Sequence, residues 1–144
     1  MYVLDTNVVS ELRKARSGKI DPHVLAWSAS VPVRSLFVSV VTILELERGV
    51  LSVSRRDQAQ GEHLSLWLQR EVLGAFSQRI LAIDTTVALR CARLHVPDPR
   101  PERDALIAAT ALVHGMTVVT RNVGDFNPTG APTLDPWNGH SLDP

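Results

Sequence analysis

Short apolar segments alternate with amphipathic segments along these 144 residues, and this alternation limits the folds open to the chain. The apolar segments have the length of β-strands, and the amphipathic segments have the 3.6-residue periodicity of helices. Strands that alternate with helices are typical of a parallel sheet covered on both faces. The sequence therefore predicts an α/β fold, with three α/β/α layers and a central parallel sheet.

Capping and turn residues set the expected limits of each element. We expect strands at about residues 2–5, 36–40, 79–83 and 117–120, and a short edge strand near Thr133 and Leu134. We expect helices from the cap candidate Asn7 to about 13, and at about 23–30, 42–51, 56–73, 85–95 and 104–113. Gly115 suits the C-terminal end of the last helix. No internal repeat or second domain is visible, so residues 1–144 are expected to form one domain.

The charge balance argues against a protein that binds nucleic acid by broad electrostatic attraction. Basic and acidic residues number 15 each, which gives no net charge. A nucleic-acid enzyme remains compatible with this balance, because a bound metal and a local group of arginines can hold phosphate.

Cysteine and hydropathy patterns indicate an intracellular protein. Cys91 is the only cysteine, so no internal disulfide can form, which favours a reducing compartment. The longest apolar stretch near Asp104, residues 105–113, is far shorter than the ~20 residues that span a bilayer. The first residues read as a strand rather than a signal peptide. We therefore expect a cytoplasmic protein with no membrane partner.

Four carboxylates stand where a parallel sheet would bring them together. Asp5 ends the first strand, Glu45 follows the second, Asp104 opens an apolar helix, and Asp125 lies just beyond the strand at 117–120. Ligands of open parallel sheets bind at the carboxyl ends of the strands. Clustered acids raise each other's pKa, and a divalent cation with oxygen ligands removes that repulsion. The sequence predicts a Mg²⁺ or Mn²⁺ site.

Each acid also has a structural explanation. Asp5 could cap a helix, and Thr42 with Glu45 fits a capping box. Asp104 could complement the helix dipole, and Asp125 could be a turn residue. Four such residues at strand-end connections would be a coincidence, so their conjunction favours one shared metal site.

Polar neighbours fit the same site. Thr6, Asn7 and Thr120 could orient the ligands or a water molecule, and Arg121 could contact a phosphate oxygen. Local turn or capping contacts remain the alternative for each of these residues.

Motifs for other chemistries do not occur. The five histidines have no paired zinc spacing, and Cys91 has no obvious histidine partner. There is no Gly-x-Ser-x-Gly elbow, no Walker A loop and no Gly-x-Gly-x-x-Gly sequence.

Four stretches together resemble the PIN-domain nucleases, and among them the VapC-like and FitB-like toxins of bacterial toxin–antitoxin pairs. The stretches are Leu4–Glu11, Ser39–Leu46, Asp104–Ala111 and Thr117–Asn122 with Asp125–Phe126, followed by Asp135–Trp137. They occur in the family's order and cover nearly the whole chain.

The resemblance implies an endoribonuclease that uses Mg²⁺ or Mn²⁺. Asp5, Glu45, Asp104 and Asp125 match the family's acidic quartet, so they would hold the metal and carry catalysis; Asp125 matches its most variable member. Metal-activated water would attack the RNA phosphodiester and leave a 5′-phosphate and a 3′-hydroxyl.

The resemblance also implies protein partners. It predicts a homodimer, with the Trp67 helix face or the Trp27 segment as candidate interfaces. It further predicts a small antitoxin that wraps the toxin and places a basic side chain into the acidic pocket.

Two other functions are open to a chain of this kind. Receiver domains and haloacid-dehalogenase-type phosphatases also place an Asp at the end of the first strand. The phosphatases need a second Asp where Asn7 stands, and both need a late Lys, whereas no Lys follows Lys19. A catalytically inactive PIN-like scaffold that binds RNA or protein is the other alternative, and the intact acids argue against it.

Overall fold

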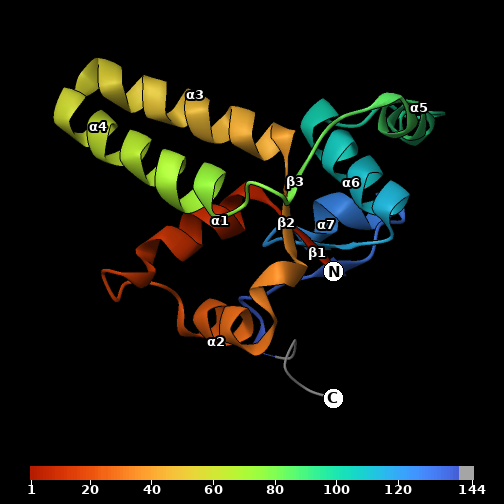
Figure 1. Cartoon of the computed structure of the whole chain (residues 1–144). Coiled ribbons are helices and arrows are strands. Elements are labelled where there is room, and N and C mark those ends of the chain that lie inside the picture. Colours follow the sequence, from red (N-terminus) through yellow and green to blue (C-terminus); the bar gives the residue numbers. More distant parts are fainter. Residues whose placement is uncertain (140–144) are drawn as a thin grey trace.

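The structure is a computed structural model that describes residues 1–139, and it is built around a five-stranded sheet (Figure 1). The strand order is β3-β2-β1-β4-β5, and every neighbouring pair is parallel. The strands are β1 (Tyr2–Leu4), β2 (Leu36–Ser39), β3 (Ile80–Leu81), β4 (Thr117–Val119) and β5 (Thr133–Leu134). The end of the expected domain, residues 140–144, lies outside the described residues.

Helices connect successive strands. They are α1 (Thr6–Leu12), α2 (Pro22–Ser30), α3 (Val40–Arg56), α4 (Gln58–Trp67), α5 (Thr85–Leu94), α6 (Glu102–His114) and α7 (Val123–Phe126). A π-helical segment, Leu68–Gly74, continues α4. Short 3-10 turns occur at Arg13–Ala15, Val33–Ser35 and Asn127–Thr129. Among the described residues, no helix has the length and apolar character needed to cross a membrane.

Alternate residues of the strands face opposite helix layers. Leu4 and Val119 join the core cluster that includes residues of α1, α2 and α3, whereas Val3 and Val118 join the cluster that includes α6 and α7. Figure 1 shows α1 to α4 on one side of the sheet and α5 to α7 on the other. The predicted three-layer fold with a central parallel sheet is confirmed.

One expected helix cap was wrong, and one of the two cap candidates for α1 was confirmed. The backbone N–H of Val41 donates to Ser39 Oγ at 3.0 Å, so α3 begins at Val40 and the expected capping box of Thr42 and Glu45 does not form. Of the two cap candidates for α1, Asp5 rather than Asn7 is the cap, because Asp5 is still extended and its carboxylate accepts from the next backbone N–H. Ser39 ends β2 and Asp5 directly follows β1, so each cap lies at the junction of strand and helix.

Two helices also extend beyond their expected limits. α3 continues to Arg56 instead of ending near residue 51, and Asp57 then caps α4 by accepting from the N–H of Gln60 at 3.1 Å. α6 begins at Glu102, two positions before the expected start at Asp104. The earlier start of α6 places two further charged side chains, Glu102 and Arg103, in its first turn.

The α3 and α4 hairpin depends on one glycine. A Cβ atom at Gly61 would lie 2.0 Å from Ser54 Oγ and 2.7 Å from the Ser54 Cα atom. Because one of these atoms belongs to the backbone, a side-chain rotation of Ser54 cannot relieve the overlap. The close approach of the two helices therefore requires glycine at this position.

We expect Gly61→Ala to destabilise the protein by about 1–3 kcal/mol, because the added methyl group forces the two helices apart. The matched control is Gly49→Ala in α3, where a Cβ atom meets nothing within 4 Å. The control should gain up to about 1 kcal/mol from helix propensity. Urea denaturation measures both changes, and an equal or greater stability for Gly61→Ala would contradict the packing account.

Candidate functional site

Three of the four predicted acids converge on one guanidinium group. Arg103 donates from Nε to Glu45 Oε2 at 2.6 Å and from Nη1 to Asp104 Oδ1 at 2.6 Å. Its Nη2 atom donates to Asp5 Oδ1. The carboxylates come from the end of β1, from α3 and from α6, so the fold brings together residues that are far apart in the sequence.

Asp5 is the most enclosed of these acids. It lies at the carboxyl end of the central strand β1, and its backbone N–H donates to Val119 O at 2.9 Å. Its side chain is 0% exposed and accepts from the Thr6 N–H at 2.7 Å and from the Thr120 hydroxyl at 2.8 Å. These donors fix the orientation of the carboxylate.

Glu45 is held by a polar contact from α1. The Thr6 hydroxyl donates to Glu45 Oε1 at 2.6 Å and lies 3.1 Å from Thr42 Oγ1. Thr42 is fully buried and stands on the same helix as Glu45. The contact leaves Oε2 of Glu45 facing Arg103.

Asp104 and Asp125 interact through their negative charges. Asp104 lies in the first turn of α6, and burial raises the pKa of its carboxyl group, with the charges of Asp5 and Asp125 adding to the rise. Arg103 opposes that rise. Asp125 belongs to the short helix α7 and is outside the ion pairs that Arg103 makes in the described residues. All four acids therefore share one region, although only three contact the same cation.

Arg103 was not anticipated from the sequence. Burial disfavours the charged guanidinium, but its hydrogen bond with Glu45 and the charge of Asp5 outweigh burial, so the pKa of Arg103 rises further above its ordinary value. The signal was its position beside Asp104, which becomes informative only once the helix is known to begin at Glu102.

The supporting residues occupy several different positions. Thr6 and Thr120 contact the acids directly, as described. Asn7 Nδ2 lies 3.5 Å from Asp5 Oδ2, and Asn7 Oδ1 accepts from the backbone N–H of Arg121 at 3.4 Å. The Arg121 guanidinium lies over the Trp137 ring, 5.0 Å from its centroid. The predicted contact between Arg121 and phosphate stays a prediction.

The convergence on Arg103 also indicates which metals this donor set suits. The guanidinium occupies the place that a metal cation would take, because oxygens of three carboxylates point at this one positive group. Carboxylate oxygens without sulfur or imidazole are ligands that Mg²⁺ and Mn²⁺ prefer. The residues present therefore fit a hard divalent cation.

A second group of potential ligands lies between α5 and α6. Ligand atoms of Cys91, His95 and Glu102 lie within 4.8 Å of one another, and Cys91 Sγ is 3.8 Å from His95 Nε2. The expectation that Cys91 has no histidine partner is therefore wrong: residues 91 and 95 are one helical turn apart and share a face.

Contacts within the protein occupy this second group. The backbone N–H of Arg100 donates to His95 Nδ1 at 3.1 Å, and His95 Nε2 lies 3.4 Å from Glu102 Oε2. Burial raises the pKa of the Cys91 thiol, and Glu102 raises it further. A metal bound here would have to displace the thiol proton.

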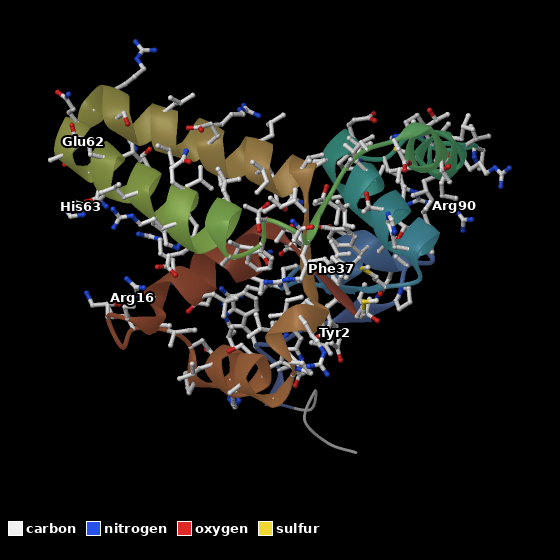
Figure 2. The ribbon with its side chains drawn as sticks, in the orientation of Figure 1. Tyr2, Arg16, Phe37, Glu62, His63 and Arg90 are labelled. Atoms are coloured by element: carbon white, nitrogen blue, oxygen red, sulfur yellow. The ribbon has the colours of Figure 1, made fainter. Side chains whose placement is uncertain are left out.

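A groove separate from the acids runs between α1 and α4. Its volume is about 460 Å³, and its floor is mainly apolar, with basic side chains at the rim. Figure 2 shows Arg16 and His63 on this side of the molecule. Arg13 lies over the Trp67 ring, 5.8 Å from the ring centroid. The lining residues include Val9, Leu12, Leu66, Arg70, Glu71 and Phe76.

Comparison with known proteins assigns the family. The model of the PIN domain matches residues 2–127, which is most of the chain. The chain belongs to the PIN domain family. The predicted resemblance is thus confirmed, and the clustered acids occupy the matched region of the PIN domain.

Relatives of this PIN domain include a ribonuclease, a toxin and a plasmid stability protein. The "VapC ribonuclease Y4jK" of Sinorhizobium fredii is 35% identical and aligns over 95% of this chain and 98% of its own. The "Plasmid stability protein StbB" of Pseudomonas syringae pv. tomato is 33% identical, with 95% and 99% covered. The "Toxin FitB" of Neisseria gonorrhoeae is 31% identical, with 96% and 99% covered.

A solved structure agrees with this PIN-domain assignment. The crystal structure of FitAcB from Neisseria gonorrhoeae superposes with a TM-score of 0.86 at 31% identity, over 96% of this chain and 99% of that one. This structural similarity covers nearly the whole chain, and the fold is the PIN fold.

We expect the buried hydroxyl of Thr120 to stabilise this PIN domain. Thr120→Val removes the donor to Asp5 and the acceptor for the Asn122 N–H, and should cost about 1–3 kcal/mol. Thr120→Ser keeps the hydroxyl and should cost about 1 kcal/mol for the lost methyl group. Urea denaturation compares the variants, and a smaller loss for valine than for serine would contradict the role of the hydroxyl.

Proposed function

We propose that this chain is a metal-dependent endoribonuclease that acts as the toxin of a toxin–antitoxin pair, with residues 1–144 as a single nuclease domain. The observation that carries the proposal is the convergence of Asp5, Glu45 and Asp104 on one positive group. The ribonuclease and toxin relatives support the same reaction and role. We also propose a cytoplasmic location, where an RNA substrate is available.

In this proposal the acids hold Mg²⁺ or Mn²⁺. Asp5 and Asp104 would bind it directly, Glu45 directly or through water, and Asp125 would complete the acidic group. When bound, the cation supplies positive charge at the scissile phosphate and activates water for in-line attack.

The chain's own residues orient the acids for this chemistry. Thr120 and the Thr6 N–H hold the Asp5 carboxylate, and the Thr6 hydroxyl holds one oxygen of Glu45. Because these contacts are already formed, the ligand oxygens need little rearrangement when a cation enters. Asn7 and Arg121 lie at the same end of the sheet, where Arg121 could contact an RNA phosphate.

We expect Asp104→Asn to lower RNA cleavage on the order of 100-fold or more, the scale observed when one group of a preorganised charged site is removed. The assay incubates purified protein and total RNA with Mg²⁺ or Mn²⁺, and EDTA should abolish cleavage. Glu47→Gln, an exposed acid on the same helix as Glu45, is the charge-matched control and should cleave normally.

Asp125→Asn in the same assay should lose less activity than Asp104→Asn, because Asp125 is outside the ion pairs around Arg103. Cleavage that survives EDTA and Asp104→Asn would contradict the proposal. A folded protein that neither binds Mn²⁺ in calorimetry nor cleaves RNA would instead support the inactive scaffold.

The groove between α1 and α4 supports a protein partner, which we propose to be a small antitoxin. Its apolar floor suits apolar side chains, and the arginines at its rim suit acidic ones. One similar solved structure is titled as FitAB bound to a DNA fragment, at 30% identity and a TM-score of 0.81. By the resemblance, a basic side chain of the antitoxin would enter the acidic pocket.

We also propose a homodimer. Trp27 is buried in the core and cannot supply a contact surface through its side chain, whereas Trp67 is only partly buried and lines the groove. Leu44 and Leu51 of α3 are more than half exposed and lie seven residues apart, on one face of the helix. We propose that this face of α3 forms part of the dimer interface.

Light scattering should therefore give a mass close to two chains of 15.8 kDa. Leu51→Asp should shift the mass to that of one chain, because a charge on this face disfavours its burial. Leu25→Asp, at an exposed leucine of α2, is the control and should leave the dimer intact. A monomeric wild-type protein would contradict the dimer.

A further inference from the structure

Arg103 occupies the position at which three carboxylates meet. It makes one hydrogen bond to each of Asp5, Glu45 and Asp104, and each bond uses a different nitrogen of the guanidinium. Among residues 1–139, no other cationic side chain forms an ion pair with these acids. A metal ion bound between these acids would compete with Arg103 for the three oxygens that now accept from it.

The balance of charge favours replacement of Arg103 by a divalent cation when such cations are present. One guanidinium carries a single positive charge against three contacting carboxylates, and Asp125 adds a fourth charge nearby. A divalent cation neutralises more of this charge at shorter distances. Arg103 therefore competes with the metal but does not satisfy the acids fully.

The displaced side chain would stay beside the site. Arg103 precedes Asp104 in the first turn of α6, and its side chain is 32% exposed, so it already reaches solvent at the edge of the acidic cluster. Its planar guanidinium matches two oxygens of a phosphate as well as it matches carboxylates. An RNA phosphate brought to the metal would offer a new anionic partner.

We infer that Arg103 is an internal counter-ion that yields its place among Asp5, Glu45 and Asp104 to the metal and then binds an RNA phosphate. This inference rests on the proposed nuclease function. In this inference Arg103 holds the three acids together before the metal binds, and it positions the RNA substrate afterwards.

Calorimetry with Mn²⁺ alone tests the exchange without measuring activity. Arg103→Gln should bind Mn²⁺ roughly tenfold or more tightly than the wild-type protein, since one charge-assisted hydrogen bond is worth about that factor. Arg90→Gln, an exposed residue of α5 shown in Figure 2, removes the same charge elsewhere and should leave Mn²⁺ affinity unchanged. Equal Mn²⁺ affinity for Arg103→Gln and the wild-type protein would overturn the exchange.

Thermal denaturation gives a second measure. Without metal, Arg103→Gln should unfold at a lower temperature, because the acids lose their counter-ion, and Mn²⁺ should raise its Tm more than that of the wild-type protein. If Arg103→Gln does not fold without metal, Arg103→Lys replaces it, and it should bind Mn²⁺ more tightly than the wild-type protein, because an ammonium group cannot reproduce the three guanidinium hydrogen bonds. A larger Mn²⁺-induced rise in the wild-type protein than in both Arg103 variants would contradict the exchange.

Binding of a fluorescent RNA oligonucleotide in Ca²⁺ tests the phosphate contact separately from cleavage. Arg103→Gln should weaken this binding about tenfold, Arg103→Lys should weaken it less, and Arg90→Gln should not change it. Unchanged RNA affinity in Arg103→Gln, or no RNA binding by the wild-type protein, would overturn the contact. A wild-type protein that binds Mn²⁺ and RNA but cleaves nothing would contradict the proposed function and leave this inference standing.

Discussion

Repulsion between carboxylates at one end of the sheet is the constraint on which the rest of this site depends. Asp5 is fully buried at the end of the central strand, and two further acids approach the same point. Such a group can persist only with positive charge and hydrogen-bond donors around it. Arg103 supplies the charge, and two threonines supply donors, so the polar contacts of three helices follow from one electrostatic requirement.

Much of the fold was open to prediction, as was the approach of Asp5, Glu45 and Asp104 to one another, because both follow from periodicity and direction. Parallel strands deliver their last residues to a common edge, so Asp5 and the residues after the second strand had to lie close together. Glu45 was correctly placed near that edge although its cap was assigned wrongly. An error of two residues in a helix start shifts the limits of an element but leaves the element on the same side of the sheet.

Other features could not be read from the sequence because they depend on where side chains turn. Arg103 precedes an acid and looks like an ordinary charged residue of a helix N-terminus until the positions of Glu45 and Asp5 are known. The contact of Cys91 with His95 was missed although the expected helix at 85–95 already placed both residues on one face. Contacts between distant segments are set by packing, which local patterns do not encode.

The position of β1 at the middle of the sheet has a consequence for how the protein is made. Asp5 bonds to the Thr120 hydroxyl across 115 residues of sequence, and β1 pairs with β4 along its whole length. A chain leaving the ribosome from its N-terminus exposes Asp5 early but cannot close the centre of the sheet until β4 has emerged. The acidic cluster is therefore assembled only after β4 has been synthesised, so a chain that stops before β4 lacks the Thr120 contact to Asp5 and a closed sheet centre.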